Sequence, residues 1–251
     1  AVNGMKGMMA QAYMLQIIAD YAAQLGEESG IGADGVSVAG ADVRPRFLYN
    51  EQLDYKMFMV PAVMAMLLTL LIGFLPALNI VGEKERGTIE QINVTPVGRF
   101  SFIFSKLIPY WLIGLFMLAW SVFLAWLIYG MFPTGSILLL FLYATLFLLI
   151  VSSLGLIVSN YSSTMQQAAL LMFFFLVIFI LMSGMLTPVA SMPEWAQLIT
   201  YVNPLRYFIE VMRALYLKGS CFADLQMQFF AMLAYAAVSW LWAILSYKKS
   251  A

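Results

Sequence analysis

Five long apolar segments that carry no charged side chain constrain this 251-residue chain more than any other feature. They cover residues 57–81, 107–129, 137–158, 168–186 and 225–246. Each is close to the ~20 residues that an α-helix needs to cross about 30 Å of hydrocarbon. Because backbone polar groups in lipid must be satisfied within the segment, such runs span as helices. The sequence therefore predicts an all-α integral membrane protein, a polytopic helical bundle with five spans.

Composition agrees with a lipid environment and narrows the chemistry. Hydrophobic residues make up 63% of the chain and charged residues 10%, far from the balance of a soluble domain. The 13 basic and 13 acidic residues cancel, so no overall field attracts nucleic acid. Cys221 is the single cysteine and histidine is absent, which excludes cysteine-based metal clusters and histidine catalysis. The phosphate-loop motif of ATP-binding proteins is also absent. We therefore expect no cofactor, no metal site and no enzyme activity in this chain.

Residues 1–56 are much more polar than the rest and predict a small extracytoplasmic α+β segment. Apolar residues from Ala10 to Leu25 follow helical spacing, and Gly26 supplies a stop. Val36 to Tyr49 contains alternating apolar residues, and Pro45 limits a strand there to a sheet edge. The chain opens without an initiator methionine. We therefore expect that it lacks an N-terminal portion.

Lysine and arginine are concentrated at two places, the connection between the first two predicted spans and the end of the chain. Cytoplasmic connections of membrane proteins carry an excess of these residues. We therefore expect the N-terminal segment to lie outside the cell and the C-terminus to lie in the cytoplasm. Arg206, Arg213 and Lys218 then fall on the outer side as exceptions. The basic residues that set this orientation are Lys84, Arg86, Arg99, Lys106, Lys248 and Lys249.

The connection between the first two spans, residues 83–99, contains a helix start signal and a stop signal. Thr88 and Gln91 fit a capping box, which predicts a short helix beginning after Thr88. Pro96 follows and ends it, because proline cannot continue the hydrogen-bond ladder. The expected product is a charged helix of about two turns between two spans. The alternative is a solvated loop with snorkelling ends.

The same connection resembles the coupling region of ABC transporter permeases of the type-2, export class. The matching patterns are E-x-E-x-G-T-x-E, starting at Glu83, and T-P-x-x-R, starting at Thr95. A second match to this family precedes the last span, at residues 192–195, 203–207 and 213–219, and a Tyr-Asn pair at 49–50 precedes the first apolar run. The resemblance covers nearly the whole chain in order and spacing.

In that family the permease has six spans, an outer domain between the first two, and a coupling helix that rests in a cleft of the ATPase. The resemblance implies that the first span and part of the outer domain are missing here, that residues 1–56 are the remnant of that domain, and that residues 57–251 form the permease domain. It implies a bacterial inner membrane location and a multidrug or efflux-like subgroup. The implied partners are a cytoplasmic ATP-binding subunit and a second permease, as homodimer or heterodimer, with a periplasmic adaptor as a further candidate. The coupling residues are Glu83, Glu85, Arg86, Gly87, Thr88, Glu90, Thr95, Pro96 and Arg99.

Residues 188–219 contain too many prolines to span. Proline breaks predict a short piece at Met192–Ile199 and a longer helix from Leu205 to about Leu217. The longer helix should place Arg206, Glu210 and Arg213 on one face, where they can pair, and Phe208, Met212 and Leu215 on the other. The pair of helices is expected to dip into the outer leaflet and return, as the resemblance also implies; an ordinary amphipathic outer loop is the alternative. The site residues of these re-entrant helices are Pro193, Trp195, Asn203, Pro204, Arg206, Glu210 and Arg213.

The predicted function is that of a permease subunit that exports an apolar or amphipathic substrate with ATP hydrolysed by a separate subunit. The spans hold no Asp, Glu, Lys or Arg, whereas ion-coupled carriers generally place such groups at mid-membrane. An alternative is a non-transporting scaffold that relays ATPase motion to an outer partner. An intramembrane lipid enzyme is disfavoured, because acid–base catalysis requires a titratable group within hydrogen-bond reach.

Overall fold

The computed structural model describes residues 13–14, 16–18, 21, 55–88, 98–187 and 189–246. The chain divides into two compact units, residues 1–53 and 54–251. In the first unit the described positions are helical and lie within the helix predicted between Ala10 and Leu25. The edge strand predicted over Val36–Tyr49 lies outside the described residues, as do Lys248 and Lys249.

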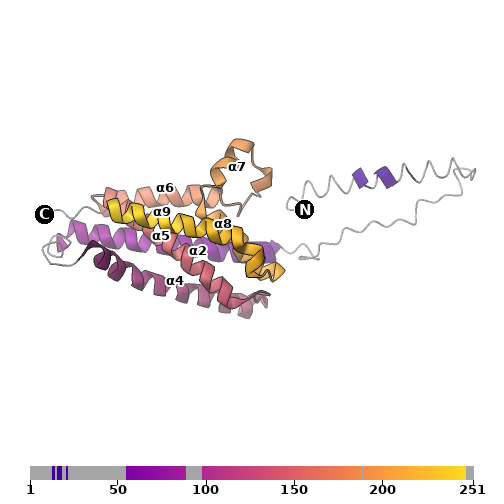
Figure 1. Ribbon diagram of the computed structural model, residues 1–251, viewed down its shortest axis with the longest axis horizontal. Helices are drawn as coiled ribbons and strands as arrows, with labels where there is room; N and C mark the ends of the chain where they lie inside the picture. The colour runs from indigo at the N-terminus through magenta and orange to yellow at the C-terminus, as the bar shows by residue number, and fades with distance from the viewer. Residues whose placement is uncertain are drawn as a thin grey trace, which may run out of the picture. The chain divides into compact units, whose positions relative to one another are not determined.

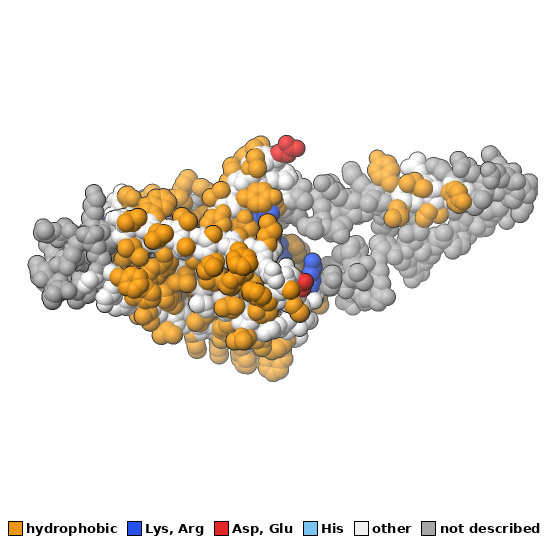
Figure 2. Space-filling model, in the orientation of Figure 1, with side chains coloured by type: hydrophobic (Ala, Val, Ile, Leu, Met, Phe, Trp, Pro, Cys, Tyr) orange, Lys and Arg blue, Asp and Glu red, His pale blue; other side chains and the backbone are white. Residues whose placement is uncertain are grey.

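The second unit is a bundle of long helices joined by short connections (Figure 1). Helices α2 and α5 form the centre of the bundle, because α2 packs against α4, α5, α6 and α8, and α5 packs against α2, α4, α6, α8 and α9. Hydrophobic side chains cover most of the long side visible in Figure 2. The elements are α2 Tyr55–Glu85, α4 Arg99–Tyr129, α5 Ile137–Tyr161, α6 Met165–Leu181, η2 Val189–Ser191, α7 Glu194–Thr200, α8 Pro204–Arg213, the π-helix η3 Ala214–Lys218, η4 Phe222–Leu225 and α9 Gln226–Ser246.

Within the described residues, four helical stretches are long and apolar enough to cross a membrane: Tyr55–Glu85, Ile103–Tyr129, Ile137–Tyr161 and Phe222–Ser246. The described residues form helices joined by turns and contain no strand, which confirms the predicted all-α bundle. The fourth predicted span, 168–186, is displaced, because α6 begins at Met165 and ends after 17 residues at Leu181. A turn follows in which Gly184 has φ of 79°, a conformation that ends a helix.

Helices α2 and α5 approach each other closely at two glycines. A Cβ atom placed on Gly155 would lie 2.8 Å from the carbonyl oxygen of Gly73 and 3.3 Å from the ring of Pro76. Small residues at such crossings let helix backbones approach closely, and packing of this kind drives helix association in lipid. This crossing sets the distance between the two helices on which the rest of the bundle packs.

Helix α8 is inserted into the core although its sequence is interrupted by charged residues. Five of its apolar side chains are buried, and the ring of Phe208 stacks on Phe147 of α5 with centroids 4.2 Å apart. The face predicted to oppose the charged one, Phe208, Met212 and Leu215, is fully buried, as the helical spacing predicts. The α8 segment therefore belongs to the bundle interior and not to a solvated loop.

Candidate functional site

Polar contacts gather at the two opposite ends of α2. At its C-terminal end lie Glu83, Lys84 and Glu85, which we call the α2-end cluster. At its N-terminal end α2 meets residues 194–218, the α7–α8 hairpin, through Phe58 and Arg213. Each group of contacts joins helices that are far apart in the sequence.

Glu83 ties α2 to α4. Its carboxylate forms an ion pair with Lys106, in which both side chains are mostly shielded from solvent. One turn earlier the amide of Asn79 donates a hydrogen bond to the hydroxyl of Tyr110, also on α4. The carbonyl oxygen of Glu83 accepts a hydrogen bond from the hydroxyl of Thr88 at 2.9 Å. The start of α4 is therefore held against the end of α2 on either side of the connection.

Lys84 reaches the C-terminal end of α5. Its ammonium group donates to the carbonyl oxygens of Ser162 at 3.0 Å, Ser159 at 3.3 Å and Asn160 at 3.4 Å. The last carbonyls of a helix have no partner within the helix and carry partial negative charge. A lysine side chain is a favourable partner there.

Glu85 reaches the N-terminal end of α6. Its carboxylate accepts a hydrogen bond from the backbone N–H of Met165 at 2.8 Å. The hydroxyl of Thr164 accepts from the N–H of Gln167 at 3.2 Å, so Thr164 is the side-chain N-cap. Free N–H groups and the positive end of the helix dipole favour a carboxylate at this position.

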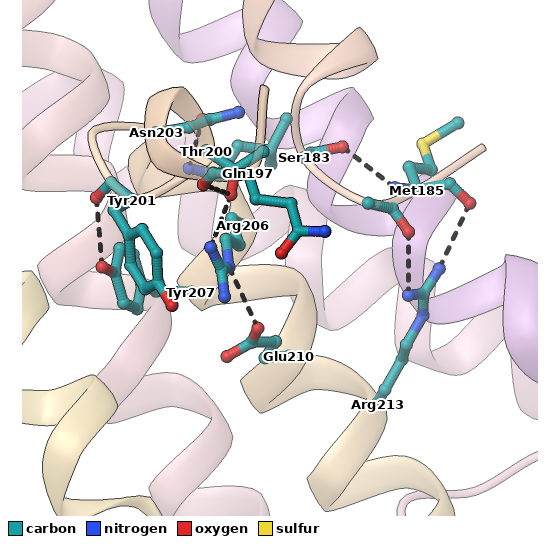
Figure 3. Close-up of polar contacts among 12 residues, drawn as sticks. Ser183, Met185, Gln197, Thr200, Tyr201, Asn203, Arg206, Tyr207, Glu210 and Arg213 are labelled. Carbon is teal, nitrogen blue, oxygen red and sulfur yellow. Dashed lines mark hydrogen bonds and ion pairs between the residues drawn. The ribbon is translucent and has the colours of Figure 1, made fainter. Parts of the chain in front are cut away.

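Asn203, Pro204 and Arg206 organise the α7–α8 hairpin (Figure 3). The side-chain oxygen of Asn203 caps α8 by accepting from the N–H of Leu205 at 3.0 Å, and its amide donates to the carbonyl of Phe179 in α6 at 2.7 Å. Pro204 occupies the first turn of α8, where the missing N–H costs nothing. Arg206 forms an ion pair with Glu210 at 3.3 Å and donates to the hydroxyl of Thr200 in α7.

Arg213 does not share the pairing of Arg206 with Glu210, and this corrects the expectation from spacing. Its guanidinium donates to the carbonyls of Gly184 at 3.2 Å, Met185 at 3.4 Å and Phe58 at 3.4 Å, and lies 3.4 Å from the ring centroid of Phe58. Arg213 finds these partners because α6 ends at Leu181, before the predicted position, so that the carbonyls of Gly184 and Met185 lie beside α8. Burial lowers the pKa of Arg213 to about 10, so the side chain stays charged at neutral pH.

The family model described as "ABC-2 family transporter protein" matches residues 2–245 of this chain. The chain belongs to the ABC-2 family.

Curated relatives of this ABC-2 chain carry permease names. It is 28% identical over 218 residues to "Probable multidrug ABC transporter permease YbhR" of Escherichia coli (strain K12), covering 87% of this chain and 58% of that protein. "Probable multidrug ABC transporter permease YbhS" of the same organism is 29% identical, over 71% of this chain and 48% of that protein. "Inner membrane transport permease YhhJ" is 29% identical, over 82% and 55%. The chain therefore spans about half the length of these relatives.

The candidate coupling residues of the ABC-2 chain divide into two groups in the structure. Glu83 and Glu85 are engaged by other helices of the same chain. Arg86 is exposed, and its side chain makes no hydrogen bond or ion pair with the described residues; Gly87 has φ of 73° and turns the chain away from α2. Glu90, Thr95 and Pro96 lie outside the described residues, as does the short helix predicted after Thr88. Arg99 is the first residue of α4, and its side chain lies outside the described part.

Other residues of the hairpin are placed as the sequence predicts. The short piece predicted at Met192–Ile199 is α7, with Pro193 at its N-cap position and Trp195 exposed. The helix predicted to reach Leu217 does so because the π-helix η3 extends α8 to Lys218. Among the described residues, no three or more aspartate, glutamate or cysteine side chains lie close enough together to hold a metal ion.

The sequence predicted no contact for Thr134 or Gly135 and used Lys84 only for the membrane orientation, whereas the structure places all three residues in contacts between helices. The hydroxyl of Thr134 donates to the carbonyls of Leu215 and Tyr216, and the N–H of Gly135 donates to that of Leu215 at 2.9 Å. A π-helix leaves backbone carbonyls without the usual partners, and the α4–α5 turn supplies them. The sequence did contain a signal for the contact of Lys84, because a basic residue at the end of a span can donate to the last carbonyls of a neighbouring helix.

Proposed function

We propose that the complete protein is the permease subunit of an ATP-binding-cassette exporter in a bacterial inner membrane. It would move an apolar or amphipathic substrate out of the cytoplasm with ATP hydrolysed by a separate cytoplasmic subunit. The ABC-2 family match over residues 2–245 carries this proposal. The names of the relatives, which include "multidrug ABC transporter permease" and "inner membrane", support it. They favour transport over the scaffold alternative.

The proposed orientation places the α2-end cluster in the cytoplasm and the α7–α8 hairpin at the outer face, with α6 as the fourth of five crossings. The basic residues near the α2–α4 connection support this orientation. Helix α6 has 17 residues, which is about 26 Å of helix and slightly less than the hydrocarbon thickness. The hairpin packs against the end of α6 through Asn203, and a polypeptide turn buried in protein is tolerated at this depth. The hairpin then dips into the outer leaflet and returns.

The proposed docking surface for the ATPase subunit is the α2–α4 connection beyond Glu85. Arg86 is exposed and available for a pair with a carboxylate of the partner. Glu90, Thr95, Pro96 and Arg99 belong to the same connection and complete the proposed surface. Exposed charges at the rim of an interface contribute to partner choice and association rate more than to affinity. A second permease, in a homodimer or heterodimer, completes the proposed transporter, and a periplasmic adaptor remains a candidate outer partner.

The test is to replace Arg86 and Glu90 together with alanine in the complete protein and to measure co-purification with its ATPase subunit. We expect the rate of association to fall about tenfold and co-purification to decrease, because two charged contacts that favour encounter with the partner are lost. Substrate-stimulated ATP hydrolysis should fall with it in proteoliposomes. Exposed Gln166 of α6, replaced by alanine, serves as the matched surface control. Full association of the double variant would contradict the docking assignment, and absence of ATP-dependent transport by the unmodified complex would contradict the exporter assignment.

A further inference from the structure

The connection between α5 and α6 is short and held by its own side chains. The hydroxyl of Ser162 donates to the carbonyl of Val158 at 2.8 Å. The N–H and the hydroxyl of Ser163 donate to the side-chain oxygen of Gln167 at 3.0 and 3.1 Å. Thr164 caps the first turn of α6. With its polar groups satisfied locally, this connection joins the end of α5 and the start of α6 with little freedom between them.

Two adjacent residues of α2 hold this connection from opposite sides. Lys84 places a positive charge at the negative end of α5, and Glu85 places a negative charge at the positive end of α6. The backbone of α2 also lies close to the first residue of α6, because a Cβ atom placed on Gly82 would lie 3.0 Å from the sulfur of Met165. The two charges therefore match the two helix ends in sign as well as in position.

The far end of α6 is held in a similar way by the α7–α8 hairpin. Asn203 donates to the carbonyl of Phe179, and Arg213 donates to the carbonyls of Gly184 and Met185 just beyond the helix. Helix α6 is thus attached at its start to the end of α2 and at its end to the hairpin. A displacement of the α2–α4 connection would act directly on the start of α6, and α6 would carry the displacement to its hydrogen bonds with the hairpin.

We propose that Lys84 and Glu85 act as a clamp that transmits movement of the α2–α4 connection to α5 and α6, and through α6 to the α7–α8 hairpin. This inference rests on the proposed exporter function. It assigns Lys84 and Glu85 a role distinct from docking, since both side chains form hydrogen bonds with other helices of their own chain. They are positioning residues that act through the helices they hold.

The experiment compares Lys84→Met with Glu85→Ala, and the double variant, in the complete permease reconstituted with its ATPase subunit. We expect the double variant to co-purify normally with the ATPase and to hydrolyse ATP within about twofold of the unmodified complex, while ATP-driven transport falls about fivefold or more. The conservative variants Lys84→Arg and Glu85→Gln keep a donor and an acceptor in place, so they should restore most transport. The matched control is Arg86→Met, which should weaken association instead.

A second measurement tests the clamp without transport. Spin labels at residues 88 and 163, both exposed in the unmodified protein, report the distance between the α2 end and the α5–α6 connection in the permease alone. We expect a narrow distance distribution that becomes broad in the Lys84→Met, Glu85→Ala double variant. Gel filtration and thermal unfolding in detergent establish that this variant is folded.

Three outcomes would overturn the clamp. Unchanged transport in the double variant would show that the contacts transmit nothing, and an unchanged narrow distance distribution would show that they do not hold the two segments together. Loss of ATPase association in the double variant would make Lys84 and Glu85 docking residues. Each of these outcomes leaves the exporter assignment standing, because that assignment fails only if the unmodified complex does not transport.

Discussion

Two arginines on the same helix show how strongly the neighbourhood decides the role of a residue. Arg206 and Arg213 both belong to α8, and spacing alone puts them with Glu210 on one face. Arg206 takes Glu210 as its partner, and the Glu210 side chain is 43% exposed. Arg213 is more deeply buried and binds backbone carbonyls of three other positions. The first contact is an ion pair whose carboxylate is exposed, whereas the second supplies donors to backbone carbonyls beyond the end of α6.

Replacing Arg213 with methionine should therefore destabilise the protein much more than replacing Glu210 with glutamine. The methionine would leave the carbonyls of Gly184 and Met185 without a donor, at a cost of about 1–3 kcal/mol. Loss of the charge on Glu210 should cost at most about 1 kcal/mol, because surface ion pairs contribute little. Thermal unfolding in the same detergent measures which of the two variants loses more stability. Equal shifts in Tm would show that the Arg213 contacts are not stabilising.

At the scale of elements, the bundle depends on the crossing of α2 and α5. Gly155 faces the backbone of Gly73, and the neighbouring contact is the ring of Pro76, so neither neighbour can rotate out of the way. At Gly114, by contrast, an added Cβ would meet the flexible end of the Leu148 side chain. A backbone neighbour can yield only by moving the helix, which a closely packed interior resists.

We expect Gly155→Ala to separate α2 from α5 and to lower stability by about 1–3 kcal/mol, the usual cost of overpacking. The control is Gly98→Ala, because a Cβ atom there meets nothing within 4 Å and the residue has an extended conformation that alanine adopts. Unfolding by denaturant in mixed micelles measures the stability of the Gly155→Ala and Gly98→Ala variants. A stable Gly155→Ala variant with unchanged transport would argue against close contact at this crossing.

At the scale of the whole second unit, residues 54–251, the proposed orientation depends on which helix ends lie together. The end of α2 contacts the α5–α6 connection through Lys84, and the end of α9 contacts α5 through Asn160 and Ser246. The hydroxyl of Tyr143, near the start of α5, donates to the carbonyl of Leu225, just before α9. Cys221 is exposed on this second side of the bundle, whereas Ser163 is exposed on the first.

Labelling with a membrane-impermeant maleimide distinguishes the two sides. In intact cells from which the outer membrane has been removed, we expect Cys221 of the complete protein to react, with any cysteine outside this sequence changed to serine. A Ser163→Cys variant in a Cys221→Ser background should react only after the cells are permeabilised. Reaction of both sites from the same side would contradict the proposed topology.

Local sequence patterns predicted the helices and several of their ends. The apolar runs located the long helices, because a helix in lipid must be apolar over a length that the bilayer sets. Pro204 predicted the start of α8, since proline is favoured in the first turn of a helix and breaks a helix that precedes it. The early end of α6 and the π-helical form of Ala214–Lys218 were not predicted, because Gly184 and the bonds from Thr134 and Gly135 act on segments already packed together.

The sequence by itself determined the class of protein, the order of its helices and the positions where charge is concentrated, because apolar length and helical periodicity are properties of a continuous segment. The tertiary structure alone decided the partners of those charges. Lys84 and Glu85 are neighbours in the sequence, yet each binds a different helix end. Long charged side chains take whichever unpaired backbone groups lie within reach, and only the packing of the bundle brings those groups there.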